Sequence, residues 1–60
     1  MNNTFWTQIK SNYYRIKDNE LLTAPILNDK VDTENSNKVT SIDDDILKLV
    51  NTQFNSKFEF

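Results

Sequence analysis

The side chains best suited to chemistry in this sequence are oxygen-bearing residues near its middle. Asp32, Glu34 and Ser36 are spaced two residues apart, and Asp43 ends the stretch 32–43. Carboxylate and hydroxyl oxygens are the ligands of hard cations such as calcium, which takes about six to eight of them. The spacing therefore predicts, as one alternative, a cation-binding loop.

Residues 32–43 read D-T-E-N-S-N-K-V-T-S-I-D and resemble the calcium loop of EF-hand and dockerin-like motifs. Val39 falls where that family carries an apolar residue, and the stretch from Ile46 resembles a dockerin exit helix. The sequence departs from the family where Asn37 replaces a glycine and Asp43 replaces a glutamate. The structural alternative is a solvated linker that ends in a helix cap. The ligands that the resemblance implies are Asp32, Glu34, Ser36, the backbone carbonyl of Lys38, Thr40 through water, and Asp43.

Most catalytic schemes lack their residues in this chain. Without histidine and cysteine there is no ordinary general base near neutral pH and no thiol nucleophile, and without glycine there is no phosphate-binding loop. Asp43, Asp44 and Asp45 remain, but acid–base catalysis needs two carboxylates in different, desolvated environments. We expect a protein that is not an enzyme and has no cofactor, apart from calcium in the alternative above.

The first predicted element is a helix over residues 4–17. Its apolar residues recur in steps of four, four and three, which is the rhythm of one helical face. Asn2, Asn3 or Thr4 would cap it by accepting a bond from a free backbone amide. The apolar residues in question are Phe5, Ile9, Tyr13 and Ile16, with Trp6 beside them.

Residues 18–41 are predicted to be an extended connector around Pro25 followed by a polar loop, because a residue before proline favours extended geometry. Asparagine is the non-glycine residue that best tolerates a positive φ, so we expect turns at the asparagines of this region. An alternative is a short strand within 21–27 that pairs with the tail 56–60, where Phe58 and Phe60 alternate with Glu59. The asparagines concerned are Asn19, Asn28, Asn35 and Asn37.

A second helix is predicted over residues 42–55. Ser41 would cap it, with an acid three residues later, and three aspartates would lie at the positive end of the helix dipole. Together these elements predict a mostly α, single small domain of residues 1–60. The apolar face of the second helix would consist of Ile42, Ile46, Leu49, Val50 and Phe54, which Phe58 could extend.

The composition indicates a small core. All seven aromatic residues lie near the two ends of the 60-residue chain, and 37% of the residues are apolar, below the usual value of about 45–50%. Neither disulfides nor zinc can stabilise a chain without cysteine and histidine. Residues 1–17 carry three cations and no acid, whereas residues 18–60 carry nine acids and four lysines. We therefore expect a chain that gains stability from a partner.

These features predict a non-catalytic, acidic and soluble small protein, such as a subunit, adaptor or inhibitor, whose amphipathic helices dock on a larger protein or on another copy. An acidic inhibitor of a nucleic-acid enzyme is a further alternative. We expect no membrane partner, no direct nucleic-acid binding, and a cytoplasmic or virion location, because no secretion signal is recognisable. The predicted partner-binding residues are Phe5, Trp6, Ile9, Tyr13, Ile46, Leu49, Val50, Phe54 and Phe58.

Overall fold

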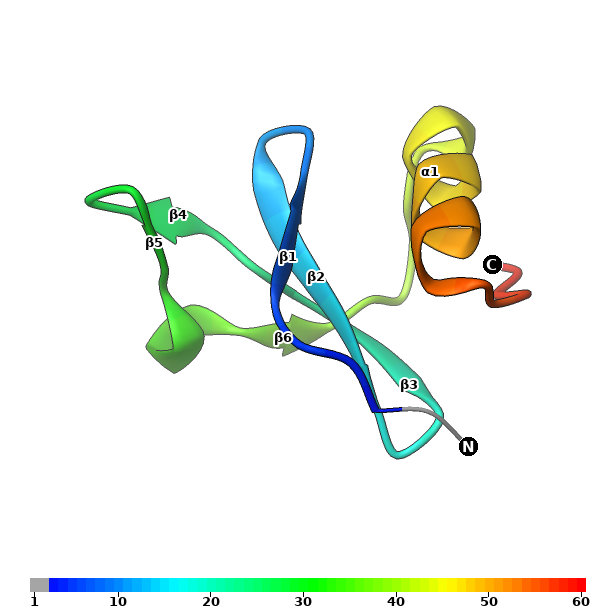
Figure 1. The fold of residues 1–60 in the computed structure, drawn as a ribbon, viewed down its shortest axis with the longest axis horizontal. Helices are drawn as coiled ribbons and strands as arrows, with labels where there is room; N and C mark the ends of the chain where they lie inside the picture. The colour runs from blue at the N-terminus through cyan, green and yellow to red at the C-terminus, as the bar shows by residue number, and fades with distance from the viewer. Residues whose placement is uncertain (1–2) are drawn as a thin grey trace.

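The computed structural model describes residues 3–60 and shows a mainly antiparallel β fold with one helix (Figure 1). Four strands form a sheet in the order β1-β2-β3-β6, and β4 pairs with β5 in a separate hairpin. The prediction of a mostly α fold is therefore wrong. The elements are β1 (Thr7–Ile9), β2 (Asn12–Lys17), β3 (Glu20–Ala24), β4 (Ile26–Leu27), β5 (Lys30–Val31), the 3-10 helix η1 (Thr33–Asn35), β6 (Asn37–Lys38) and the helix α1 (Asp44–Phe54).

The helix predicted over residues 4–17 is a β-hairpin. Strands β1 and β2 pair with Ile9 opposite Asn12, so the chain reverses within the spacing that suggested a continuous helical face. Ile9 and Ile16 reach the core, whereas the side chain of Phe5 is 90% exposed. The segment is rich in aromatic and β-branched residues, which fit the pleated surface of a sheet better than a helix.

The residues proposed as caps of that helix hold the hairpin in place. The backbone amide of Thr4 donates to the carbonyl of Ile16 at 2.9 Å, and the amide of Ile16 donates to Oγ1 of Thr4 at 2.8 Å. The amide of Asp18 donates to Oδ1 of Asn3 at 3.1 Å. Asn2, the third proposed cap, lies outside the described residues. The chain before β1 is thus fixed to β2 by side chains as well as backbone.

Residues 18–41 contain strands and two-residue turns in place of the predicted connector and loop. Asp18 and Asn19 have φ values of 53° and 67°, and Asn28 and Asp29 have values of 52° and 63°. Two adjacent positive φ angles define the turn that best matches the twist of a hairpin. Turns at Asn19 and Asn28 are confirmed. Asn35 is the last residue of η1 and Asn37 lies in β6, and neither has the positive φ on which the prediction was based.

Strand β3 occupies part of the predicted connector and pairs with β2 from Glu20 to Ala24. The extended geometry expected before Pro25 is confirmed, and it belongs to a sheet strand. The alternative pairing with the C-terminal tail is wrong, because β3 pairs with β2 and β6 while residues 56–60 lie in no strand. Hydrogen bonding to two neighbours makes β3 an interior strand of the sheet.

The helix predicted over residues 42–55 is confirmed as α1, but its cap is not Ser41. Asp43 occupies the N-cap position without a side-chain capping bond, and Asp44 and Asp45 lie in the first turn, where the helix dipole favours acids. At the other end Asn55 adopts a left-handed conformation with φ 53°, which ends the helix.

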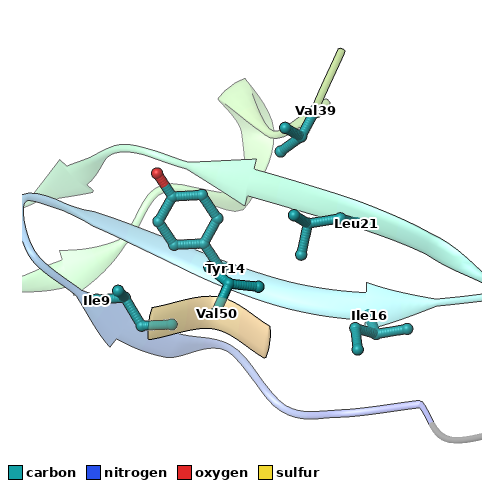
Figure 2. Close-up of a cluster of buried hydrophobic side chains, with 6 residues drawn as sticks. All are labelled: Ile9, Tyr14, Ile16, Leu21, Val39 and Val50. Carbon is teal, nitrogen blue, oxygen red and sulfur yellow. The ribbon is translucent and has the colours of Figure 1, made fainter. Parts of the chain in front are cut away.

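The core lies between α1 and one face of the sheet. Figure 2 shows the buried side chains of this core converging from the strands and the helix. Tyr14 from the first part of the sequence is buried here, and Phe54 and Phe58 from the last part pack against the same cluster. No helix among residues 3–60 is long and apolar enough to cross a membrane. The buried cluster is Ile9, Tyr14, Ile16, Leu21, Val39 and Val50, with Ile42, Ile46, Phe54 and Phe58 packed against it.

Candidate functional site

The face of the sheet that points away from α1 carries aromatic, aliphatic and cationic side chains. Tyr14 of β2 lies in the core, so Tyr13 and Arg15 point to the opposite side, because successive side chains of a strand alternate. Antiparallel pairing places Ala24 beside Tyr13 and Leu22 beside Arg15. We name this surface the outer face. Its residues are Trp6, Tyr13, Arg15, Leu22 and Ala24.

Trp6 and Arg15 are in direct contact on the outer face. Trp6 precedes Thr7, which pairs with Tyr14, so the next pair along the two strands would bring Trp6 opposite Arg15. The guanidinium carbon of Arg15 lies 5.7 Å from the centroid of the Trp6 ring. A cation–π contact at a partly exposed site contributes about 0.5–1 kcal/mol. The contact keeps the guanidinium group close to the sheet.

The Nε atom of Arg15 is buried and has no hydrogen-bond partner within residues 3–60. Leaving a buried donor without an acceptor costs about 1–3 kcal/mol or more when the group is charged. Arg15 also forms no ion pair with any residue that the structure describes. The outer face therefore contains a cationic donor group whose bonding capacity is incompletely used in the free chain.

A rim of charged side chains borders the outer face. Lys17 lies opposite Glu20, and Nζ of Lys38 lies 3.8 Å from Oε1 of Glu20. Both side chains of this ion pair are about half exposed, so it contributes little to stability. One acid thus stands beside three cations, Arg15 included, and the face with its rim is positively charged.

The predicted partner-binding residues separate into three groups in the structure. Ile9 and Val50 are buried in the core, and Ile46, Phe54 and Phe58 pack against it. Phe5 and Leu49 are exposed, with 90% and 44% of their surface accessible. Only Trp6 and Tyr13 belong to the outer face. The proposed pair of docking helices does not exist, because the first helix is a hairpin.

Sequence reasoning placed Arg15 and Leu22 outside the binding set. Arg15 lies within the predicted helix 4–17 but not among the residues of its apolar face, and Leu22 lies within the predicted connector. The signal that could have found Arg15 is the alternation within β2, where buried Tyr14 and Ile16 enclose it. Leu22 carries no such signal by itself, because its position on this face depends on its pairing with Arg15.

The six positions of the calcium hypothesis are distributed over several elements. Glu34 lies in η1, Lys38 in β6 and Asp43 at the cap of α1. Oδ2 of Asp32 accepts a hydrogen bond from Nδ2 of Asn35 at 2.7 Å. No group of three or more acidic side chains that could hold a metal ion occurs within residues 3–60. Calcium binding stays a prediction, without a preformed ligand cluster to support it.

Two hollows border α1 and its C-terminal tail. A pocket of about 300 Å³ is lined by Ile16, Asn19 and residues 54–58. Another hollow is bordered by Lys10, Ile46 and the aspartates at the start of the helix. The three aspartates are exposed to solvent, which is not the desolvated arrangement that acid–base catalysis by carboxylates requires.

The outer face is thus the surface on which aromatic, aliphatic and incompletely bonded cationic groups occur together. Comparison of this chain with protein-family models, curated proteins and solved structures finds no match.

Proposed function

We propose that this chain is a non-catalytic protein-binding module that docks through the outer face of its sheet. The observation that carries the proposal is the contact between Trp6 and Arg15, with the Arg15 Nε buried and unbonded among the described residues. Tryptophan, tyrosine and arginine dominate the energetics of protein interfaces. Here all three residue types occur on one face of the sheet.

The position of the outer face supports docking over a structural role. Helix α1 covers the opposite face, where Val50 and Leu21 are almost completely buried. On the outer face Trp6, Tyr13, Arg15 and Leu22 are only partly buried. Covering them with a partner would remove further aromatic and aliphatic surface from water at about 25 cal/mol per Å².

The sheet-face proposal is tested with the variants Trp6→Ala and Leu49→Ala in a pull-down from native extract, with the full chain immobilised. We expect proteins retained by the wild type and by Leu49→Ala to be lost from Trp6→Ala. Leu49 is the matched control because it is an exposed apolar residue on the helix. Thermal unfolding by circular dichroism checks that both variants remain folded. If the bound proteins were lost from Leu49→Ala but retained by Trp6→Ala, the docking surface would lie on the helix.

A further inference from the structure

We infer that the outer face binds an extended peptide segment in which a carboxylate side chain is flanked by apolar side chains, and that Arg15 binds the carboxylate. This inference rests on the proposed function and adds the chemistry of the partner. The argument combines the unsatisfied donor of Arg15, the apolar residues around it and the charge of the rim.

Both the geometry of the Arg15 side chain and the cost of its unbonded donor favour binding of a carboxylate. Its guanidinium group presents several N–H donors in a plane, which match the two oxygens of a carboxylate. The Nε donor has no acceptor within residues 3–60, so a partner that supplies one removes an existing cost of burial. Because Nε is covered in the free chain, the guanidinium group must turn against the Trp6 ring to present it. Binding should therefore change the environment of Trp6.

The side chains next to Arg15 determine which peptide residues can lie on either side of the bound carboxylate. Leu22 lies beside Arg15 on β3, and the Tyr13–Ala24 pair lies one position further along on the same face. Ala24 has a short side chain and is 1% exposed, so Tyr13 and Leu22, which are both partly buried, supply the apolar surface that a partner can reach beside Arg15. These groups are apolar, and they favour aliphatic or aromatic side chains on either side of the acid.

Charge on the outer face favours an acidic peptide over a neutral one. The outer face and its rim carry three cations, Arg15, Lys17 and Lys38, and one acid, Glu20, whereas the rest of the chain has a net negative charge. An acidic segment is thus attracted to this face and repelled elsewhere, which raises the association rate and fixes its orientation.

A polynucleotide fits this surface less well than an acidic peptide. Affinity for a phosphate backbone grows with the number of cations that neutralise successive phosphates. Lys17 and Lys38 both lie near Glu20, which leaves Arg15 as the cation of the outer face without a neighbouring acid among the described residues. A single such contact suits one carboxylate.

The test begins with selection from a phage-displayed library of random peptides on the full-length chain. We expect enriched peptides to carry aspartate or glutamate next to apolar residues. A selected peptide is then titrated against the chain while the emission of Trp6, the sole tryptophan, is recorded. We expect an emission change and a loss of affinity of roughly tenfold when the acid of the peptide becomes its amide. This comparison leaves the protein unchanged and is independent of its folding.

Variants of the protein complete the test. Arg15→Lys keeps the charge but loses the planar donors, so we expect roughly tenfold weaker binding of the acidic peptide. Lys48→Gln is the control, with affinity within about twofold of the wild type because Lys48 is exposed on α1, outside the outer face and its rim. Enriched peptides that need Trp6 but carry no acid would overturn the inference and leave the proposed function standing. If no selected peptide requires Trp6 for binding, the inference and the proposed function are both overturned. The same holds if single-stranded DNA binds more tightly than the selected acidic peptides and requires Arg15.

Discussion

At the scale of single residues, this chain forms tight turns without glycine. The left-handed conformation costs an L-residue roughly 1–2 kcal/mol relative to glycine, although asparagine and aspartate tolerate it better. Within residues 3–60, asparagine and aspartate occupy five of the six positions with positive φ, and Lys10 occupies the sixth with φ 59°. Lysine has no short polar group to compensate locally, so the turn between β1 and β2 stores conformational strain.

Replacing Lys10 should therefore stabilise the protein. We expect Lys10→Gly to raise the free energy of unfolding by about 0.5–1 kcal/mol, and Lys10→Asn to raise it by less, because both accept a positive φ more readily. Urea denaturation followed by circular dichroism measures the difference. Ser11→Gly is the matched control in the same turn, and it should be neutral or slightly destabilising because Ser11 does not have a positive φ. Equal stabilisation by both glycines would contradict the explanation by strain.

At the scale of elements, the end of α1 is connected to the tail through one side chain. Nδ2 of Asn51 donates to the carbonyl of Phe58 at 3.0 Å, and Oδ1 of Asn51 accepts from the amide of Phe58 at 2.9 Å. The same oxygen accepts from Oγ of Ser56 at 2.8 Å. The amide group of Asn51 thus bonds Phe58 as a neighbouring strand would, and this holds the Phe58 ring against the core.

Removing this side chain should release the tail. We expect Asn51→Ala to lower the free energy of unfolding by about 1–3 kcal/mol, because the bonded groups of Phe58 lose their partner. Hydrogen exchange of the Phe58 amide should become faster, as measured by NMR. The control is Thr52→Ala on the next, exposed position of the helix, which should leave the exchange rate of Phe58 unchanged. An unchanged rate in Asn51→Ala would show that ring packing alone holds the tail.

At the scale of the whole molecule, one small core combines residues from both ends of the sequence. Tyr14 comes from the N-terminal hairpin, and Phe54 and Phe58 come from the C-terminal end. Figure 2 shows the Val50 side chain of α1 in the same cluster as Tyr14 and Ile9. A domain of this size has few buried side chains to offset its chain entropy. Sheet and helix should therefore unfold together in a single transition.

Val50 provides the test of this cooperativity, because its side chain is completely buried. We expect Val50→Ala to lower the free energy of unfolding by about 2–3 kcal/mol through lost burial and a residual cavity. Leu49→Ala, one residue away and 44% exposed, should cost less than half as much. Circular dichroism of the helix and emission of Trp6 should give the same midpoint in each variant. Separate midpoints would show that helix and sheet unfold independently.

Local patterns in the sequence predicted α1 and two of the turns correctly. Apolar spacing with acids at its start indicates a helix over residues 42–55, and that segment has no competing alternation. Asn19 and Asn28 mark turns because few residues accept a positive φ. For residues 4–17 the same spacing rule was wrong, since Phe5, Ile9, Tyr13 and Ile16 fit a helical face only if the chain continues without reversal. The turn at Lys10 contains no glycine or asparagine to signal it.

The candidate site was accessible to prediction only in part. Trp6 and Tyr13 were identified as binding residues by their type, because aromatic side chains concentrate hydrophobic surface. Arg15 and Leu22 become neighbours only through the pairing of β2 with β3, which joins residues separated along the chain. Whether a side chain lies in the core or on the outer face depends on that pairing, because shifting a strand by one residue exchanges its two faces.

The residue types and spacing in the sequence by themselves determined the chemical inventory, the charge division between residues 1–17 and 18–60, and the C-terminal helix. These properties depend on single residues or on neighbours within a few turns of chain. The tertiary structure alone decided that Tyr14 shares one core with Phe54 and Phe58, and that Trp6 contacts Arg15. Those outcomes depend on strand pairing and helix packing, whose free energy comes from contacts between segments distant in the sequence.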